Sequence, residues 1–394
     1  MVKLGEVADF VRGPFGGSLT KSIFKENGYA VYEQQHAIYH HTNIRYFIDQ
    51  IKFDEMQRFK VKPGDLIMSC SGTIGEVYII PSNAPVGVIN QALLKLSVTS
   101  KLDRNYFKNW LESPIFKDII FKFSKGAAIP NVPGVKILKE IEIPLPPLEE
   151  QHRIVSILDA SFEKIDALKK NAEENLKNAK ALFQQVLAQE LKPKDGWVEK
   201  KLGEVGDFKN GMNFVHNESG TEIHMLGVGD FGDLFFINDV EKLPILSLNK
   251  LPSEDYLLKD EDIVFVRSNG NKQLVGRSLV VYPKGVLTTF SGFCIRFRKR
   301  IDDINIIFLT YYLKTKDTRK KLFGNGANIS NLNQKMLQDL LFVYPSLEEQ
   351  HRIVQTLDTL SEKCRRLEEV AQQTIRECDA LKQSILRQAF SGEL

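Results

Sequence analysis

The chain has 394 residues and a formal net charge of +3, and it is 43% hydrophobic and 26% charged. These values are typical of a globular protein too long for one compact core, so we expect two or three domains. The sequence contains no run of about 18 apolar residues, which argues against a membrane span. Its start, Met1–Glu6, lacks the apolar core of a signal peptide. The weakly basic balance permits nucleic-acid binding, provided that charge is clustered locally or supplied by partner proteins.

The cysteines are too sparse for a disulfide framework. Cys70, Cys294, Cys364 and Cys378 form no CxxC pair. We therefore expect a protein of the reducing cytoplasm.

A duplication is the main signal in the sequence. The segment LEEQHRIV at 148–155 recurs without change at 347–354, and KLGEV at 3–7 recurs at 201–205. The spacing of about 200 residues is far longer than the period of a solenoid repeat, so it indicates a duplicated domain.

Each copy begins with a globular part, which we place at residues 1–147 and 193–346. Short apolar runs at 65–68, 77–80 and 263–266, bounded by turn residues, predict strands. The segments 104–122 and 304–322 have a helical pattern. We therefore expect α+β domains, with the strand order left open.

Each copy ends in a long helix, predicted at 148–192 and 347–394. Apolar positions alternate in steps of four and three, a period of 3.5 that is typical of a left-handed coiled coil. The predicted seam residues are Ile154, Leu158, Ile165, Leu168, Ala172, Leu182 and Val186 in the first helix, and Ile353, Leu357, Leu360, Cys364, Leu367, Ala371, Cys378, Leu381 and Ile385 in the second.

Helices of this length with one apolar seam need a partner, and the simplest partner is the other helix. An antiparallel pair gives the simplest closure of the chain. The predicted fold is therefore α+β, with two similar domains separated by two long helices in an antiparallel, pseudo-two-fold symmetric coiled coil. Asn175 and Thr374 occupy seam positions, either as tolerated polar residues or to control register.

The sequence offers no convincing catalytic or metal site. The segment 270–278 resembles a phosphate loop, but its glycines are spaced differently and Arg277 replaces the lysine. His152 and His351 each lack the paired His or Cys of a zinc site, and the histidines between 36 and 41 fit a polar surface loop. We therefore expect a non-catalytic protein without metal or cofactor.

Polar and basic side chains in loops are the candidates for reading DNA bases. In the first domain they are Lys21, Lys25, Gln34, Gln35, His36, Arg45, Ser69, Ser71 and Thr73. In the second domain they are Arg267, Ser268, Asn269, Asn271, Lys272 and Gln273. The second set follows an apolar strand and is the preferred site of base contact, with an ordinary solvated turn as the alternative. Segments 126–131 and 326–331 could bind phosphate through backbone N–H groups, although a simple turn is slightly favoured.

Several motifs carry a family resemblance. PLPPLEEQ at 144–151 recurs in weaker form as YPSLEEQ at 344–350, and the first copy also contains GPFGGSL at 13–19, GDLI at 64–67 and GTIG at 72–75. With these motifs the whole chain resembles the specificity subunits of type I restriction–modification enzymes.

The resemblance implies that two target recognition domains each read half of a split, asymmetric DNA site. The helices would separate the domains and dock two methyltransferase subunits. Adenine methylation with S-adenosylmethionine would then belong to those partners, and ATP-driven cleavage to restriction subunits. The second copy departs from the pattern at 343–344 and 210–214, so its base-reading loop is not assigned by the resemblance.

The alternatives belong to other classes. One is a scaffold whose two globular domains bind proteins, and a weaker one is a fragment of a fused methyltransferase–nuclease, for which no cofactor or nuclease motif is present. Salt separates a DNA reader from a scaffold, because phosphate contacts weaken steeply as salt rises whereas an apolar protein interface need not.

Overall fold

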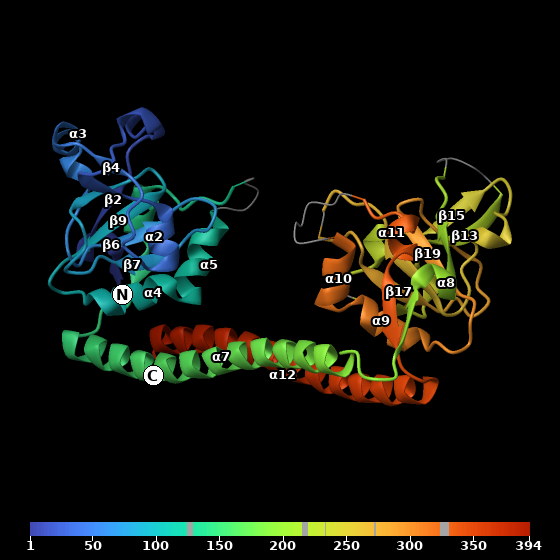
Figure 1. The fold of residues 1–394 in the computed structure, drawn as a ribbon. Helices are drawn as coiled ribbons and strands as arrows, with labels where there is room; N and C mark the ends of the chain where they lie inside the picture. Colours follow the sequence, from blue (N-terminus) through green and yellow to red (C-terminus); the bar gives the residue numbers. More distant parts are fainter. Residues whose placement is uncertain (124–128, 215–219, 233, 272, 324–330) are drawn as a thin grey trace. The chain divides into compact units, whose positions relative to one another are not determined.

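The computed structural model describes residues 1–123, 129–214, 220–232, 234–271, 273–323 and 331–394. They form two compact units, one of Met1–Glu173 with Ala371–Leu394 and one of Glu174–Val370. Each unit therefore holds one globular domain together with part of α7 (Leu148–Glu190) and part of α12 (Leu347–Ser391) (Figure 1). Within the described residues, no helix is long and apolar enough to cross a membrane.

The first unit is built from small sheets and short helices. Its strands are β1 (Val2–Lys3), β2 (Ala8–Arg12), β3 (Tyr29–Tyr32), β4 (Phe47–Ile48), β5 (Lys60–Val61), β6 (Leu66–Ser69), β7 (Val77–Ile79), β8 (Gly87–Ile89), β9 (Leu93–Val98) and β10 (Glu142–Ile143). Its short helices are α1 (Leu4–Val7), α2 (Gln34–Tyr39), α3 (Gln50–Glu55), α4 (Arg104–Glu112), α5 (Pro114–Lys122) and α6 (Val135–Glu140). Among the described residues the strand orders are β2-β9-β6-β7, β4-β3-β8-β5 and β1-β10.

The core of the first unit is organised around β6. Successive side chains of a strand point to opposite faces, and both faces of β6 are buried. Leu66 and Met68 pack in one cluster with Trp110 of α4, while Ile67 packs with Tyr32 of the second sheet. The sheet containing β6 is thus covered by helices on one face and by a second sheet on the other.

The second unit repeats this plan. Its strands are β11 (Val198–Lys201), β12 (Gly206–Asn210), β13 (Thr221–Leu226), β14 (Phe236–Ile237), β15 (Ile245–Leu248), β16 (Asp262–Val266), β17 (Ser278–Val281), β18 (Thr288–Phe290), β19 (Cys294–Lys299) and β20 (Leu341–Tyr344). Its short helices are α8 (Leu202–Val205), α9 (Ile306–Leu313), α10 (Lys316–Phe323) and α11 (Gln334–Gln338). Within the described ranges the strand orders are β12-β19-β16-β17-β14, β15-β13-β18 and β11-β20.

The core around β16 matches the core around β6. Phe265 packs with Phe308 of α9, whereas Val264 packs with Phe290 of the other sheet. The duplication read from the short repeated motifs therefore extends through both globular domains, and the α+β prediction is confirmed.

The repeated KLGEV motif holds the start of each domain against its end. In the first unit Val2 pairs with Ile143, and the N–H of Leu4 donates to the carbonyl of Ile141 at 2.8 Å. In the second unit the N–H of Leu202 makes the same bond to the carbonyl of Leu340 at 3.0 Å. Each domain therefore begins beside the strand that leads into its long helix.

The glutamine of the repeated LEEQ motif joins each long helix to its domain. Gln151 is fully buried. Its Oε1 accepts the N–H of Asp103 at 2.8 Å, and its Nε2 donates to the carbonyls of Lys101 at 3.0 Å and Pro146 at 2.8 Å. Because a buried amide needs partners, this network fixes where α7 begins.

Gln350 makes the corresponding bonds in the second unit. Its Oε1 accepts the N–H of Asn305 at 2.8 Å, and its Nε2 donates to the carbonyls of Asp303 and Pro345, both at 2.9 Å. The motif therefore has a structural role at both junctions.

In each unit, the segments of α7 and α12 run antiparallel. In the first unit Asp166 pairs with Lys382 at 2.5 Å and Lys169 with Asp379 at 2.6 Å, so a step forward along α7 is a step back along α12. In the second unit Lys180 of α7 lies 3.9 Å from Glu368 of α12 and Glu190 pairs with Arg352 at 2.9 Å, again in opposite order along the two helices. The predicted antiparallel pairing is confirmed within each unit.

Buried positions recur at every seventh residue of both long helices. They are Leu158, Ile165, Ala172 and Ala179 in α7, and Leu357, Cys364, Ala371 and Cys378 in α12. This spacing agrees with one position of the predicted heptad. Alanine and cysteine at the contact allow the helices to approach closely, because the distance between helix axes depends on the side chains between them.

At the other predicted seam position, four leucines are not in the seam. Leu168, Leu182, Leu367 and Leu381 are 55, 45, 54 and 48% exposed. The position that is covered instead lies four residues after each buried one, as with Phe162 and Phe183, which pack against the domain cores. Each helix covers a globular domain as well as its partner helix, so its buried stripe is turned away from the ideal two-helix seam.

The remaining seam residues are divided between the domain cores and the helix surface. Ile154 and Ile353 belong to the domain cores, whereas Val186, Leu360 and Ile385 are half-buried. Asn175 is exposed, so it does not control register from within a buried contact.

Candidate nucleic-acid interface

In the first domain, the loop after β6 is hydrogen-bonded to the segment that precedes α6. Ser71 forms a β-bridge with Asn131, the N–H of Gly72 donates to Pro130 at 2.9 Å, and the N–H of Val132 donates to Cys70 at 3.0 Å. Two stretches that were separate candidates in the sequence therefore lie side by side. Residues 124–128 lie outside the described residues.

The second domain has the same junction after β16. Ser268 forms a β-bridge with Asn331, and the N–H of Leu332 donates to the carbonyl of Arg267 at 2.8 Å. Residues 69–75 and 267–276 each follow the central buried strand of their domain. Because they overlap the stretches predicted to read DNA bases, we call them the reading loops. Lys272 and the segment 324–330 lie outside the described residues.

Gln34 holds the first reading loop in place. Its Nε2 donates to the carbonyls of Ser71 at 2.6 Å and Thr73 at 3.2 Å. Its amide donors are thus used within the protein, so the structure makes Gln34 a positioning residue. Thr73 is exposed and Ser71 half-buried, which leaves these two side chains at the loop surface.

Two candidates in the first domain were wrong, because His36 and Ser69 are fully buried. Nδ1 of His36 accepts the N–H of Glu33 at 2.7 Å, and its Nε2 lies 3.1 Å from the carbonyl of Asn43. Oγ of Ser69 accepts the N–H of Glu76 at 3.0 Å. Both side chains stabilise turns and cannot reach a DNA groove from these positions.

An aromatic stack adjoins the basic candidates Lys25 and Arg45 of the first domain. Phe24 and Tyr46 stack with ring centroids 4.3 Å apart, and the Arg45 guanidinium lies 4.3 Å from the Tyr46 centroid. Lys25 follows Phe24 in the sequence, is exposed and lies 3.8 Å from Asp49, and Lys21, three residues before Phe24, is also exposed. This basic cluster suits phosphate contacts. Gln35, in contrast, donates to the Glu33 carboxylate at 3.2 Å.

The second reading loop is shaped by its own asparagines. Oδ1 of Asn269 accepts the N–H of Asn271 at 2.7 Å, and Oδ1 of Asn271 accepts the N–H of Gln273 at 3.0 Å. These are Asx turns. Arg267 is half-buried and donates from Nη1 to the carbonyl of Gly292 at 3.2 Å, which leaves further guanidinium N–H groups for a ligand.

A hollow of about 430 Å³ lies at the second reading loop. It is lined by Val228, Ser268, Asn269, Gly270, Phe293 and Asn331. Phe293 is 58% exposed, so an aromatic face adjoins amide and hydroxyl groups. A base could stack on such a face and be read along its edge. The sequence analysis missed Phe293 and Val228, because they come from segments distant from the loop.

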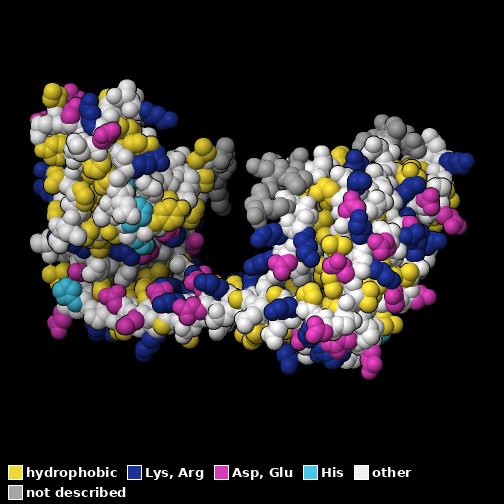
Figure 2. Space-filling model, in the orientation of Figure 1, with side chains coloured by type: hydrophobic (Ala, Val, Ile, Leu, Met, Phe, Trp, Pro, Cys, Tyr) yellow, Lys and Arg dark blue, Asp and Glu magenta, His cyan; other side chains and the backbone are white. Residues whose placement is uncertain are grey.

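Burial raises the pKa of the Cys70 and Cys294 thiols to about 12, so both stay protonated at neutral pH and are poor nucleophiles. No cluster of three or more His, Cys, Asp or Glu that could hold a metal occurs within the described ranges. Figure 2 shows lysine and arginine mixed with acidic side chains over the face drawn, as the small net charge leads one to expect.

Duplicated α+β domains with one reading loop each, joined to antiparallel helix segments, have the architecture of a two-domain DNA-recognition protein. The sequence matches the family described as type I restriction modification DNA specificity domain over residues 1–178 and again over 194–377. The chain therefore belongs to that family, and the resemblance seen in its motifs is confirmed.

Individual relatives agree with this assignment. The StySPI specificity subunit of Salmonella potsdam is 28% identical over 85% of this chain and 76% of its own length. The MjaVIII specificity subunit of Methanocaldococcus jannaschii is 24% identical over 100% of this chain and 92% of its own length.

Solved structures share the fold. A chain from a study of complex assembly and conformational transition of the type I R-M system has a TM-score of 0.78 at 22% identity, covering 100% of this chain and 97% of its own. The HsdS subunit from Thermoanaerobacter tengcongensis has a TM-score of 0.57 at 22% identity, covering 100% and 96%.

Family membership decides between the function classes left open by the sequence. The chain is a DNA specificity subunit with two target recognition domains, and such subunits are non-catalytic components of restriction–modification complexes. DNA is accordingly its ligand.

Proposed function

We propose that each globular domain reads one half of an asymmetric bipartite DNA site, and that its reading loop supplies base contacts. The supporting observation is that both loops follow the central strand and pair with the segment before the last short helix through Ser71–Asn131 and Ser268–Asn331. The loops differ in side chains, because Ser71 and Thr73 stand in one and Arg267 and Asn269 in the other. One frame with two sets of side chains fits two different half-sites.

Arg267 is the sharpest case for base reading. Arginine recognises guanine through a bidentate pair, worth about 1–3 kcal/mol against a wrong base. Its bond to Gly292 ties the guanidinium to the residue before Phe293, which lines the hollow together with Asn269. We assign Arg267 to a base edge, and the cluster of Lys21, Lys25 and Arg45 to phosphates.

Two methyltransferase subunits dock on the exposed leucines of the long helices in this proposal. The first unit presents Leu168 and Leu381, and the second presents Leu182 and Leu367, each three residues after a buried seam position. The same surface thus occurs twice. S-adenosylmethionine and adenine methylation belong to these partners, and ATP-driven cleavage to restriction subunits.

The test is a map of methylated adenines in cells that express this chain with its methyltransferase. Arg267→Ala should relax one position in one half-site and leave the other half-site unchanged. Arg300→Ala, on the same domain outside the reading loop, is the control and should leave the motif intact. An unchanged motif at full methylation in the Arg267 variant would remove this residue from the interface.

A further inference from the structure

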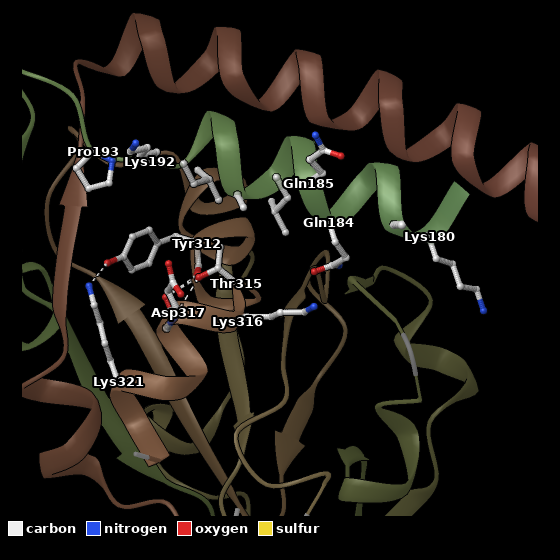
Figure 3. Close-up of a pocket in the computed structure, with 15 residues that line it drawn as sticks. Lys180, Gln184, Gln185, Lys192, Pro193, Tyr312, Thr315, Lys316, Asp317 and Lys321 are labelled. Atoms are coloured by element: carbon white, nitrogen blue, oxygen red, sulfur yellow. Dashed lines mark hydrogen bonds between the residues drawn. The ribbon is translucent and has the colours of Figure 1, made fainter. Parts of the chain in front are cut away.

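A groove of about 740 Å³ runs along the last turns of α7 in the second unit (Figure 3). Residues between Lys180 and Pro193 form one wall, and residues between Tyr312 and Lys321 form the other. Figure 3 shows Gln184 extending from α7 toward Lys316 across this space. The groove lies within one compact unit and is separate from the reading loop.

The groove has an apolar floor and a basic rim. Ala181, Ala188 and Pro193 line the groove with exposed apolar surface, above Leu187, Leu191 and Tyr312, which are each buried to at least 95%. The rim carries lysines at 180, 192, 316 and 321, against the single carboxylate of Asp317. An apolar floor between positive charges is complementary to an acidic amphipathic segment.

The lysines are only partly neutralised by the protein. Lys180 lies 3.9 Å from Glu368, and the Lys321 ammonium donates to the Tyr312 hydroxyl at 3.3 Å. Among the described residues, Lys192 and Lys316 have no carboxylate within ion-pair distance. The rim therefore keeps positive charge for a bound partner.

The first unit fills the corresponding place with its own side chains. Helices α5 and α10 begin at equivalent points, each after a hydroxyl that caps the first turn. Ile115 and Ile119 of α5 pack against the core of the first unit. At the same positions of α10 stand Asp317 and Lys321, both exposed, so apolar filling is replaced by charge.

The long helices show the same replacement. When the two helices are aligned at their identical LEEQHRIV starts, Phe390 is equivalent to Leu191 and Arg387 is equivalent to Ala188. Phe390 is 6% exposed, and Arg387 lies 3.5 Å from Asp118 of α5. Phe390 and Arg387 fill the space beside α5 in the first unit. The smaller Leu191 and Ala188 leave the equivalent space beside α10 open in the second unit.

The length of the groove suits a helix. From Lys180 to Leu191 the wall rises about 17 Å at about 1.5 Å per residue, which is roughly three helical turns. A nucleotide-sized ligand would not use a wall of this length. DNA would meet the lysines but would leave the apolar floor unused, because phosphate contacts are polar.

We propose that an acidic amphipathic helix of a partner protein docks in this groove, at the second unit and not at the corresponding place of the first. The inference rests on the proposed function, in which the chain assembles with methyltransferase and restriction subunits. The apolar side of the helix covers the exposed Ala181, Ala188 and Pro193 above this floor, and its carboxylates pair with Lys192 and Lys316. The chain thereby gains a docking site that is present once, beside the leucine surface that is present twice.

The test begins with the full chain coexpressed with its partner subunits. The double variant Lys316→Glu/Lys321→Glu should weaken the binding of one partner subunit at least ten-fold by native mass spectrometry, and added salt should weaken the unsubstituted complex in the same way. The matched control is Lys320→Glu on the same helix, exposed but outside the groove lining. DNA binding by the chain alone should be the same in all three proteins.

A photo-crosslinker identifies the occupant directly. With p-benzoylphenylalanine in place of Gln184, irradiation of the complex should yield one crosslinked partner peptide that is acidic and amphipathic. Crosslinking to DNA or to a basic segment would overturn the proposal, as would unchanged assembly of the double variant or an equal loss with Lys320→Glu. If the unsubstituted chain assembles with no subunit, the proposed function fails and this inference fails with it. If the unsubstituted chain assembles and the double variant binds as well as it does, only the proposed docking of a helix in the groove is overturned.

Discussion

The buried amide of Gln350 is expected to be among the most sensitive positions of the second unit. Replacement by methionine keeps the length of the side chain and removes all of its polar atoms. The N–H of Asn305 and the carbonyls of Asp303 and Pro345 would then lose their partner. A buried polar group left unsatisfied costs about 1–3 kcal/mol. Allowing for the apolar gain of methionine, we expect a loss of about 3–5 kcal/mol, a large share of the roughly 5–15 kcal/mol that stabilises a domain.

The measurement is urea unfolding followed by tryptophan fluorescence, with hydrogen exchange to localise the effect. The chain has two tryptophans, and they report separately, because Trp110 lies in the first unit and Trp197 packs near Phe308 in the second. Gln350→Met should lower the Trp197 transition, and Gln151→Met should lower the Trp110 transition. The exposed neighbour His351 is the control, and His351→Ala should change stability by less than about 0.5 kcal/mol.

If Gln350→Met loses less than about 1 kcal/mol, water or a shifted backbone replaces the amide, and the LEEQ glutamine does not hold the junction. If both transitions fall equally, the units do not respond separately.

Further predictions concern the backbone, the helices and the duplication. Gly64 has φ of 86°, and a Cβ there would meet the Arg104 guanidinium at 2.4 Å. Gly64→Ala should therefore lower the free energy of unfolding by about 1–2 kcal/mol, as measured by thermal unfolding. Glu261 already has a side chain at a left-handed position, so Glu261→Ala should change the free energy of unfolding little. We consider one heptad inserted after Ala172 and another after Ala371, which keep the one-in-seven buried pattern and add about 10.5 Å to each helix. The methylated half-sites should then move apart by roughly three base pairs at about 3.4 Å each. An unchanged spacing would show that the helices do not set the distance between half-sites. A chain of residues 1–199 lacks Leu386 and Phe390, which complete the first core, and should recruit Leu187 and Leu191 from a second copy; its methylated sites should be inverted repeats of one half-site, and a stable monomer would contradict this.

The duplication and the long helices could be predicted because they are written locally. Eight identical residues and apolar positions spaced by seven can be recognised without knowing which residues lie near them in space. The exposed leucines could not be predicted, because Leu168 and Phe162 are both apolar and only the globular domain decides which of them is covered. The pattern of a helix records that it has an apolar side, whereas its neighbours decide how wide that side is.

The reading loops could be located in the sequence more readily than their individual contacts. A polar, glycine-containing loop after an apolar run predicts a surface loop, and Gly270, Asn271 and Gln273 are indeed exposed. Nothing in the letters separates His36, whose ring nitrogens are used inside the domain, from an exposed histidine, since its partners Glu33 and Asn43 are backbone groups. Phe293 was not predicted, because it comes from a segment distant from the loop and because a phenylalanine in the sequence looks like a core residue.

The pairing of β1 with β10, and of β11 with β20, has a consequence for how such a protein changes over generations. In each domain the chain enters and leaves at neighbouring strands, as Val2 beside Ile143 and Val198 beside Tyr344 show. A module whose two ends meet can be cut out and replaced without moving what it is attached to. The bordering segments KLGEV and LEEQHRIV occur in both copies, so the genetic exchange of one whole domain at these borders would give the protein a new half-site in a single event, with the helix junctions and the other reader left intact.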